Sequence, residues 1–398
     1  MKTGITHLYI PGPTNVPEVV RQAMNVPMQD MRAADFGDLT LNLFRDMKKV
    51  FKTTTGEVMF FPGSGCSAWE AAITNTLNVG DTVLMARHGQ FSTLWADMAE
   101  RLGLNVITVD VAWGAGVPVT EFARILGADK GDKIKAVFVT HNETATGVTS
   151  DVAAVRRVMD ECFHDALLFV DGVSSVGSID FRMDEWGVDL AVTGTQKGLM
   201  LPAGLGILCT SQKAIEASKT CTSRRVFYDF KDMLAMNANG YFPHTPPTQL
   251  LHGMRKSLDR LLDEGLENVF ARHARLAEGV RRGIAAWGLD LCAETPALYS
   301  DTVSAIKTGE VDAREVLRIA YTRYNTSFGS GLARLAGKVF RIGHLGDLNE
   351  GMTLTALSIA EASLAEAGVK IEFGSGVGAA LAWYTEGRIP QAARIAAE

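Results

Sequence analysis

The stretches LLFVDGVSSVGS (167–178) and LAVTGTQKG (190–198) decide the fold of this chain. Each begins with a short apolar run, the first ending at Asp171 and the second followed closely by Lys197. Apolar runs of this length without polar alternation are typical of strands that are covered on both faces. The two stretches therefore predict neighbouring buried strands, with an aspartate and a lysine just beyond their carboxyl ends.

The same pattern recurs between about residues 56 and 210. Short apolar runs alternate with loops rich in Gly, Ser, Thr and Asn and with helix-like segments, among them 66–76, 93–102 and 151–163. This alternation predicts an α/β domain with a mostly parallel sheet. The remaining predicted strands are 58–61, 82–86, 106–109, 136–140 and 206–209.

The alternation of apolar runs and helix-like segments ends after residue 210. Residues 211–246 look irregular, and a long amphipathic helix over 248–287 is expected to break at Gly265. The rest of the chain predicts a smaller α+β domain, so the domain boundary is expected inside this helical connection. The elements expected there are strands at 302–306 and 339–342 and helices at 313–324 and 352–367.

The composition excludes several classes of protein. The 398 residues include 39 Lys and Arg against 45 Asp and Glu, a formal charge of −6, which gives no electrostatic footprint for nucleic acid or an anionic membrane. The apolar runs are too short for a membrane span, and the N-terminus does not read as a secretory signal. Five scattered cysteines without a CxxC pair argue against disulfides and structural zinc. We therefore expect a cytoplasmic protein without a bound metal.

The residues after the predicted strands suit one particular ligand. Ser64-Gly65-Cys66 opens a helix with small residues that suit a phosphate, Asp171 needs a cationic partner, and a desolvated Lys197 would have a reactive amine. Taken singly, these features have plainer explanations: a tight turn, a helix cap and a solvated lysine. Together they match pyridoxal phosphate, whose aldehyde binds a lysine and whose ring nitrogen pairs with a carboxylate.

Six motifs carry a resemblance to a known family. They are IPGPTNVP (10–17), PGSGCSAWEAA (62–72), HNETATGV (141–148), LLFVDGVSSVGS (167–178), TGTQKGLMLPAGLG (193–206) and GKVFRIGHLGDLNE (337–350). They span nearly the whole chain. The sequence resembles the class V, fold-type I aminotransferases that depend on pyridoxal phosphate, within them the serine–glyoxylate and alanine–glyoxylate group, with aspartate–glyoxylate aminotransferases as close relatives.

The resemblance implies a domain organisation. A large domain over residues 16–265 would hold a mostly parallel seven-stranded sheet and the cofactor. A smaller C-terminal α+β domain would cover residues 266–398. Residues 1–15 would form an N-terminal segment that packs on the active site and the dimer interface.

The resemblance also implies a role for each matching residue. Lys197 would form the Schiff base and shuttle a proton, and Asp171 would pair with the pyridine nitrogen. Arg341 and Gly12 would bind the substrate, Arg341 through a bidentate pair with its α-carboxylate. The other implied cofactor contacts are Ser64, Gly65, Cys66 and Gln196 at the phosphate, Phe91 and Val173 on the two ring faces, Thr144 near the ring oxygen, and Thr245 at the phosphate of the partner subunit's cofactor.

The implied reaction transfers the amino group of a small L-amino acid to glyoxylate by a ping-pong mechanism, and it gives glycine and a 2-oxo acid. Serine is the expected donor. Alanine and aspartate stay open as donors, and aspartate would need a second cation, for which Arg32, Arg87 and His88 are candidates. More distant alternatives are a cysteine desulfurase-like lyase, for which Cys292 lacks the expected mobile-loop setting, and a non-catalytic cofactor-binding regulator. Small molecules are the expected partners, with no nucleic acid or membrane.

The resemblance further implies a homodimer with active sites at the interface, with a tetramer as an alternative. Relatives often carry an aromatic hydroxyl near the partner's phosphate. This chain has Phe242 beside Tyr241 there, and the sequence leaves open whether either residue contributes to the partner's phosphate site.

Overall fold

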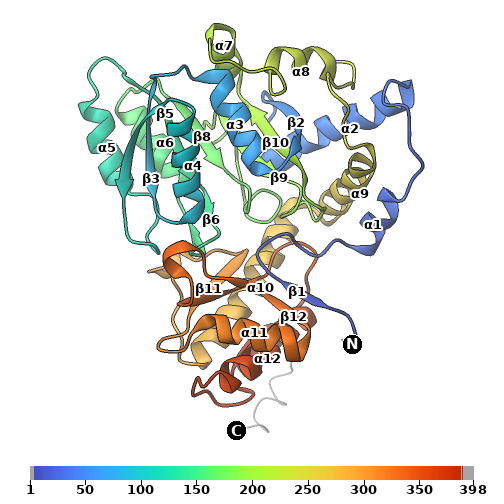
Figure 1. Ribbon diagram of the computed structural model, residues 1–398, viewed down its shortest axis with the longest axis vertical. Coiled ribbons are helices and arrows are strands. Elements are labelled where there is room, and N and C mark those ends of the chain that lie inside the picture. The colour runs from blue at the N-terminus through green and yellow to red at the C-terminus, as the bar shows by residue number, and fades with distance from the viewer. Residues whose placement is uncertain (1–3, 387, 389–398) are drawn as a thin grey trace.

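A seven-stranded sheet forms the centre of the computed structural model, which describes residues 4–386 and 388 (Figure 1). All neighbouring strands are parallel except where β10 pairs with β2 and β9, so the predicted mostly parallel sheet is confirmed. The strands, in spatial order, are β2 (Glu57–Gly63), β10 (Gly204–Thr210), β9 (Leu190–Gly194), β8 (Leu167–Asp171), β5 (Ile134–Thr140), β3 (Thr82–Arg87) and β4 (Asn105–Asp110).

Helices cover the sheet, and those expected from the sequence are present within a few residues of the predicted bounds. The break at Gly265 also holds, because it separates α9 from α10. The helices of this part of the chain are α1 (Glu18–Met24), α2 (Ala34–Phe51), α3 (Gly65–Thr76), α4 (Gln90–Arg101), α5 (Val119–Ala128), α6 (Val152–Glu161), α9 (Thr248–Glu264) and α10 (Leu266–Ala286).

The prediction that residues 211–246 are irregular is wrong. This segment contains α7 (Gln212–Thr220) and α8 (Phe230–Asn237). Each helix has a capping side chain: Ser211 accepts a hydrogen bond from the Ala214 N–H at 3.1 Å, and Asp229 accepts one from the Lys231 N–H at 2.8 Å. Such caps stabilise short helices that have little amphipathic pattern of their own.

A second, four-stranded sheet lies below the first in Figure 1. Its strand order is β1 (His7–Tyr9), β12 (Thr326–Ser330), β13 (Val339–Gly343) and β11 (Val303–Lys307). Only β11 and β13 follow from the apolar pattern, because β1 has three residues and β12 contains two serines and a glycine. The helices that accompany this sheet are α11 (Ala313–Tyr324), α12 (Glu350–Glu366) and α13 (Ser375–Thr385).

Each sheet has its own hydrophobic core. In the first, the rings of Trp95, Phe138 and Phe169 stack with centroids 4.5 Å apart at each step. Helix α10 enters both cores, because Val269 packs in the first and Leu276 in the second. We propose on this basis that the chain divides as its sequence implies, into residues 16–265 and 266–398, with residues 1–15 as a separate segment. Residues 1–3, 387 and 389–398 of this division lie outside the part of the chain that the structure describes.

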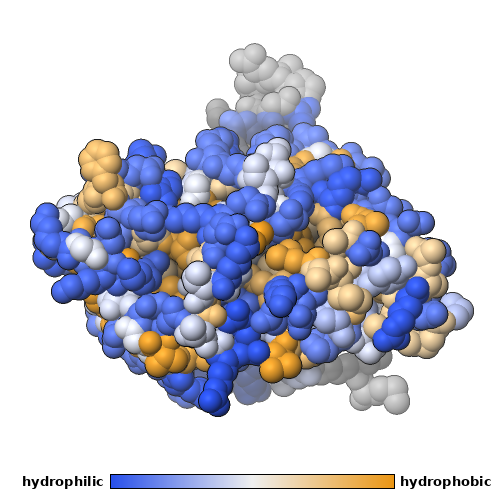
Figure 2. All heavy atoms as spheres, turned by 90° about the horizontal axis from the view of Figure 1, so that it is seen from above, coloured by the Kyte–Doolittle hydropathy of each residue, from blue (hydrophilic) through white to orange (hydrophobic). Residues whose placement is uncertain are grey.

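The surface is mostly hydrophilic when it is seen from the side that carries α7 and α8, with apolar side chains exposed in separate places (Figure 2). No helix within residues 4–386 is long and apolar enough to cross a membrane.

Candidate active site

A cavity of about 220 Å³ opens where the parallel strands of the large sheet end. It lies there because the carboxyl ends of parallel strands meet at one edge, where open α/β sheets bind their ligands. Ten of the twelve site residues that the sequence predicts line it, and Thr245 and Arg341 do not. The ten are Gly12, Ser64, Gly65, Cys66, Phe91, Thr144, Asp171, Val173, Gln196 and Lys197.

Asp171 ends β8 and is 4% exposed. Burial raises the pKa of its carboxyl to about 7, although the Val173 N–H donates to Oδ1 at 2.8 Å and favours the charged form. The charge of Lys197 also lowers this pKa. Asp171 is therefore a carboxyl that a cationic partner inside the cavity would fully ionise.

Lys197 follows β9 and is 8% exposed. Burial and, to a smaller extent, the charge of Arg341 lower the pKa of its amine to about 8, and the charge of Asp171 opposes both effects. Its Nζ donates a hydrogen bond to the Pro11 carbonyl oxygen. A substantial share of this amine is therefore neutral, and so nucleophilic, at mildly alkaline pH.

The N-terminus of α3 forms one wall of the cavity. Ser64 is the N-cap residue, and no side chain caps the first turn. Helix N-termini of this kind bind anions through their free N–H groups. Gly65 is required here, because a Cβ would collide with the Val173 side chain. The amide oxygen of Gln196 is buried without a partner among the residues that the structure describes, as expected of a group that awaits a ligand.

Arg341 lies directly behind the cavity, on β13 of the smaller sheet. It is 6% exposed, so it does not face solvent. Its Nε donates to the Ser330 carbonyl oxygen and its Nη1 to the Thr144 carbonyl oxygen, both at 2.9 Å. Burial lowers the pKa of its guanidinium to about 10, and the charge of Glu143 acts in the opposite direction. Arg341 thus stays charged at neutral pH.

Residues 8–332 match the family model of the class V aminotransferases. The chain belongs to this family. Relatives support the assignment over nearly the whole length: the chain is 60% identical to the serine–glyoxylate aminotransferase of Hyphomicrobium methylovorum, over 96% of this chain and 95% of that protein. It is 54% identical to the L-aspartate–glyoxylate aminotransferase of Paracoccus denitrificans, over 95% and 96%.

Solved structures of aminotransferases share the fold. The ureidoglycine–glyoxylate aminotransferase of Bacillus subtilis superposes with a TM-score of 0.89 at 26% identity, over 96% of this chain and 99% of that one. The fold class and the family predicted from the sequence are therefore confirmed. The protein is an aminotransferase that depends on pyridoxal phosphate.

The cavity fits this cofactor. Its uncapped helix N-terminus suits a phosphate, the buried carboxyl of Asp171 suits a protonated ring nitrogen, and the amine of Lys197 suits an aldehyde. Thr144 adds a hydroxyl, which donates to the Ser174 hydroxyl at 2.7 Å.

Three further residues line the cavity without having been predicted: Pro13, Trp69 and Ser174. The spacing could have indicated Trp69, because it stands four residues after Gly65 on α3 and so on the same helical face. Its side chain is buried, and its indole N–H favours the charged form of the Asp171 carboxyl, whose pKa it lowers.

We predict that Asp171→Asn stabilises the cofactor-free protein, and more so at pH 8 than at pH 5. The folded state favours the protonated carboxyl, so the wild-type protein loses folding stability as the pH rises through the raised pKa of about 7. Asparagine removes the charge and keeps the acceptor for the Val173 N–H. The gain should grow with pH by at most about 1.4 kcal/mol per unit.

Urea unfolding at both pH values measures this gain. Asp160→Asn is the control, because Asp160 lies on the surface with 66% of its side chain exposed. A gain that is the same at both pH values would contradict the prediction.

Proposed function

We propose that this enzyme moves the amino group of a small L-amino acid to glyoxylate, with serine as the preferred donor. The reaction gives glycine and a 2-oxo acid in two half-reactions at one site. The observation that carries this proposal is the small cavity that the buried Lys197 and Asp171 both line, with Arg341 hydrogen-bonded to the cavity residue Thr144. The 60% identical relative named as a serine–glyoxylate aminotransferase supports the same pair of substrates.

The cofactor would be held by residues of the large domain. When bound, pyridoxal phosphate supplies an aldehyde that condenses with amines and a ring that takes up electrons. We assign its phosphate to Ser64, Gly65, Cys66 and Gln196, its two ring faces to Phe91 and Val173, and its ring oxygen to Thr144.

Two buried groups would move or hold protons. The amine of Lys197 would take the proton from the substrate Cα, which its lowered pKa of about 8 favours because a neutral amine is a base. The carboxylate of Asp171 would hold a proton on the ring nitrogen. A cation paired with Asp171 would in turn bring the pKa of this carboxyl down from about 7.

The surroundings of the candidate second cations favour a donor with a small, uncharged side chain. Arg87 is engaged by Asp110 through two hydrogen bonds of 2.7 Å. Burial lowers the pKa of the His88 imidazole, which leaves it neutral. Arg32 is exposed and, like the other two, does not line the cavity. Aspartate, the donor named for the 54% identical relative, stays the alternative.

The cysteine desulfurase-like alternative lacks its nucleophile in the expected form. Cys292 is 2% exposed, and burial raises the pKa of its thiol to about 11. A buried thiol with a raised pKa is a poor nucleophile.

Solution experiments should find that L-serine converts the purified holoenzyme faster than L-aspartate or L-alanine. A single-turnover absorbance scan with each amino acid in excess, without a keto acid, measures this directly. Serine should bleach the visible cofactor band, and glyoxylate should restore it. If aspartate alone bleaches the band, the alternative donor is correct, and if no amino acid does, the proposed function fails.

Arg341→Ala should slow both half-reactions by at least about 100-fold, because the variant loses two charge-assisted hydrogen bonds to the substrate carboxylate. The cofactor should stay bound, since none of the cofactor contacts assigned above involves Arg341. Single-turnover rates with serine and with glyoxylate measure the effect. Arg318→Ala serves as the control, because Arg318 lies on the surface of α11 and pairs with Glu315. Equal rates for the two variants would refute the assignment.

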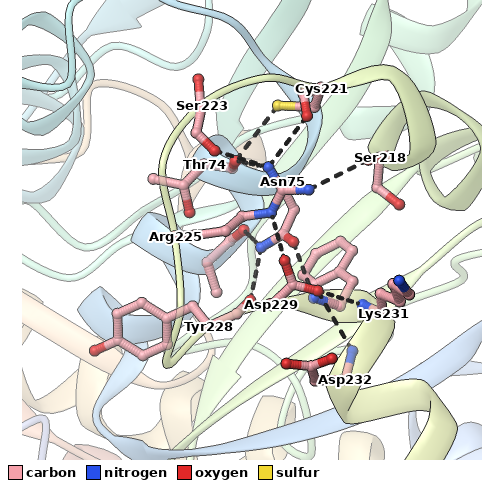
Figure 3. A network of polar contacts seen from close by, with 12 residues as sticks. Thr74, Asn75, Ser218, Cys221, Ser223, Arg225, Tyr228, Asp229, Lys231 and Asp232 are labelled. Atoms are coloured by element: carbon pink, nitrogen blue, oxygen red, sulfur yellow. Dashed lines mark hydrogen bonds and ion pairs between the residues drawn. The ribbon is translucent and has the colours of Figure 1, made fainter.

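We also propose that the enzyme forms a homodimer, and a surface loop held by hydrogen bonds supports this. Arg225 donates to the carbonyl oxygens of Thr74, Ser218 and Ser223 at 3.2, 3.3 and 2.8 Å, and it pairs with Asp229, as Figure 3 shows. This network fixes the loop that carries Val226 and Phe227, which are 79% and 41% exposed.

Apolar side chains that a fixed loop holds in solvent are typical of protein interfaces. The Phe227 ring also stacks on His244 at 4.7 Å, next to the exposed Thr245. We therefore place the partner subunit against this loop, with Thr245 directed to the partner's cofactor phosphate. Phe242 is buried against Phe36 and Phe44, which leaves Tyr241 as the aromatic hydroxyl at this place.

Val226→Asp should weaken the dimer at least about tenfold, because it buries an unpaired charge at the interface. Sedimentation velocity over a range of protein concentrations measures the change. Phe163→Asp is the matched control, since Phe163 is 93% exposed and follows α6, away from this loop. Dimers of unchanged affinity in Val226→Asp would place the interface elsewhere.

We also propose a cytoplasmic location. All five cysteines are free, three of them at least partly accessible. Such thiols fit a reducing compartment.

A further inference from the structure

Glu143 is a fully buried carboxylate close to the cavity, but it is not part of the cavity lining. It is the second residue of the short strand β6 (Asn142–Glu143), directly before Thr144. None of the roles proposed above uses it. A carboxylate in this environment is costly unless hydrogen bonds satisfy its oxygens.

Its first set of hydrogen bonds holds the start of α4. Oε1 accepts from the Phe91 N–H at 3.2 Å, and Oε2 accepts from the Ser92 N–H at 2.9 Å and the Ser92 hydroxyl at 3.1 Å. The negative charge thus sits on the positive end of the helix, where it is favourable. Phe91 is the residue of this turn that lines the cavity.

Ser92 extends this contact into the turn before the helix. Its hydroxyl oxygen accepts from the N–H groups of His88 and Gly89 at 3.1 and 3.0 Å. Gly89 packs so closely on the Glu143 side chain that a Cβ at this position would collide with it. The carboxylate, the turn and the first residues of α4 therefore form one fixed unit.

A second contact fixes the loop on the other side. Oε1 also accepts from the Ala145 N–H at 3.1 Å, which closes the chain around Thr144. The Thr144 carbonyl oxygen accepts the hydrogen bond from Arg341 Nη1 at 2.9 Å. The direction of this carbonyl, and with it the position of the guanidinium, depends on the bond between Glu143 and Ala145. The charge of Glu143 also opposes the effect of burial on the pKa of Arg341.

We propose that Glu143 is a positioning residue that sets two groups at once: Phe91, which covers the cofactor ring, and Arg341, which binds the substrate carboxylate. It acts through its two oxygens, one shared between α4 and the Thr144 loop and one given to α4 alone. The inference rests on the roles proposed above for Phe91 and Arg341.

Glu143→Gln tests the inference with little change in shape. A glutamine has one acceptor oxygen, and its amide nitrogen would face N–H groups that need an acceptor. Buried N–H groups would then lose their partners, which displaces the turn, the loop or both. We expect the holoenzyme to release cofactor at least about tenfold faster and KM for amino acid and glyoxylate to rise about fivefold, while kcat changes less than about threefold.

Cofactor release is followed by fluorescence after dilution of the holoenzyme, a measurement that needs no catalytic activity. Glu161→Gln is the control for the change in charge, since Glu161 is exposed on α6. Ser92→Ala is a second variant, which removes the hydroxyl donor to Glu143 and the acceptor for the His88 and Gly89 N–H groups on the α4 side. It should speed cofactor release and leave KM unchanged. Unfolding midpoints show whether each variant is folded.

Double variants separate positioning from general damage. If Glu143 acts through Phe91, Glu143→Gln should not speed cofactor release further in a Phe91→Ala background. If it acts through Arg341, it should not raise KM further in an Arg341→Ala background. Effects that multiply in both backgrounds would overturn the inference, and so would a Glu143→Gln enzyme that behaves like Glu161→Gln.

These outcomes are distinct from failure of the proposed function. A wild-type enzyme that does not transaminate glyoxylate refutes that function, but the cofactor-release rates still test the link to Phe91. A wild-type enzyme that is active, with unchanged KM and release in Glu143→Gln, refutes the inference alone.

Discussion

The buried pair of Asp171 and Lys197 is the constraint on which the rest of the structure depends. Both groups are placed by wholly buried strands, β8 and β9. Because burial disfavours the charged form of each group, the pKa of the carboxyl rises to about 7 and that of the amine falls to about 8. Such shifts make a lysine nucleophilic and a carboxyl responsive to a cation, but they cost folding free energy. The large core and the stacked aromatic rings behind the strands supply the stability that this arrangement needs.

The site also requires that the two sheets keep a fixed position relative to each other. The N-terminal segment joins them: β1 pairs with β12 of the small sheet, and five residues after β1 the Thr14 N–H donates to the Gln196 carbonyl oxygen at 3.1 Å. The Thr14 hydroxyl donates to the carbonyl oxygen of Lys197 itself at 3.2 Å. From the other direction, Arg341 reaches from β13 to the Thr144 loop of the large sheet. The reactive lysine is therefore enclosed by contacts from both halves of the molecule.

The parts of this arrangement that local chemistry determines could be predicted from the sequence. Apolar runs predicted all seven strands of the large sheet, and the residues after them predicted most of the cavity lining. These patterns missed α7 and α8, which depend on single capping residues, and β1, which is a strand only because β12 lies beside it. The role of Glu143 could not be predicted for a similar reason. Its hydrogen bonds join segments about 50 residues apart in the chain, and no spacing in the sequence shows that they meet.

The balance of buried charge explains why the site suits small substrates. Lys197 and Arg341 are the cations in and directly behind the cavity, and Asp171 and Glu143 are the corresponding anions. The helix N-terminus to which we assign the phosphate has a partial charge that suits an anion without adding a full one. One substrate carboxylate can be met by Arg341. A second carboxylate would have to draw Arg87 from Asp110 or protonate His88 against the effect of burial, and each of these steps costs free energy that serine does not need.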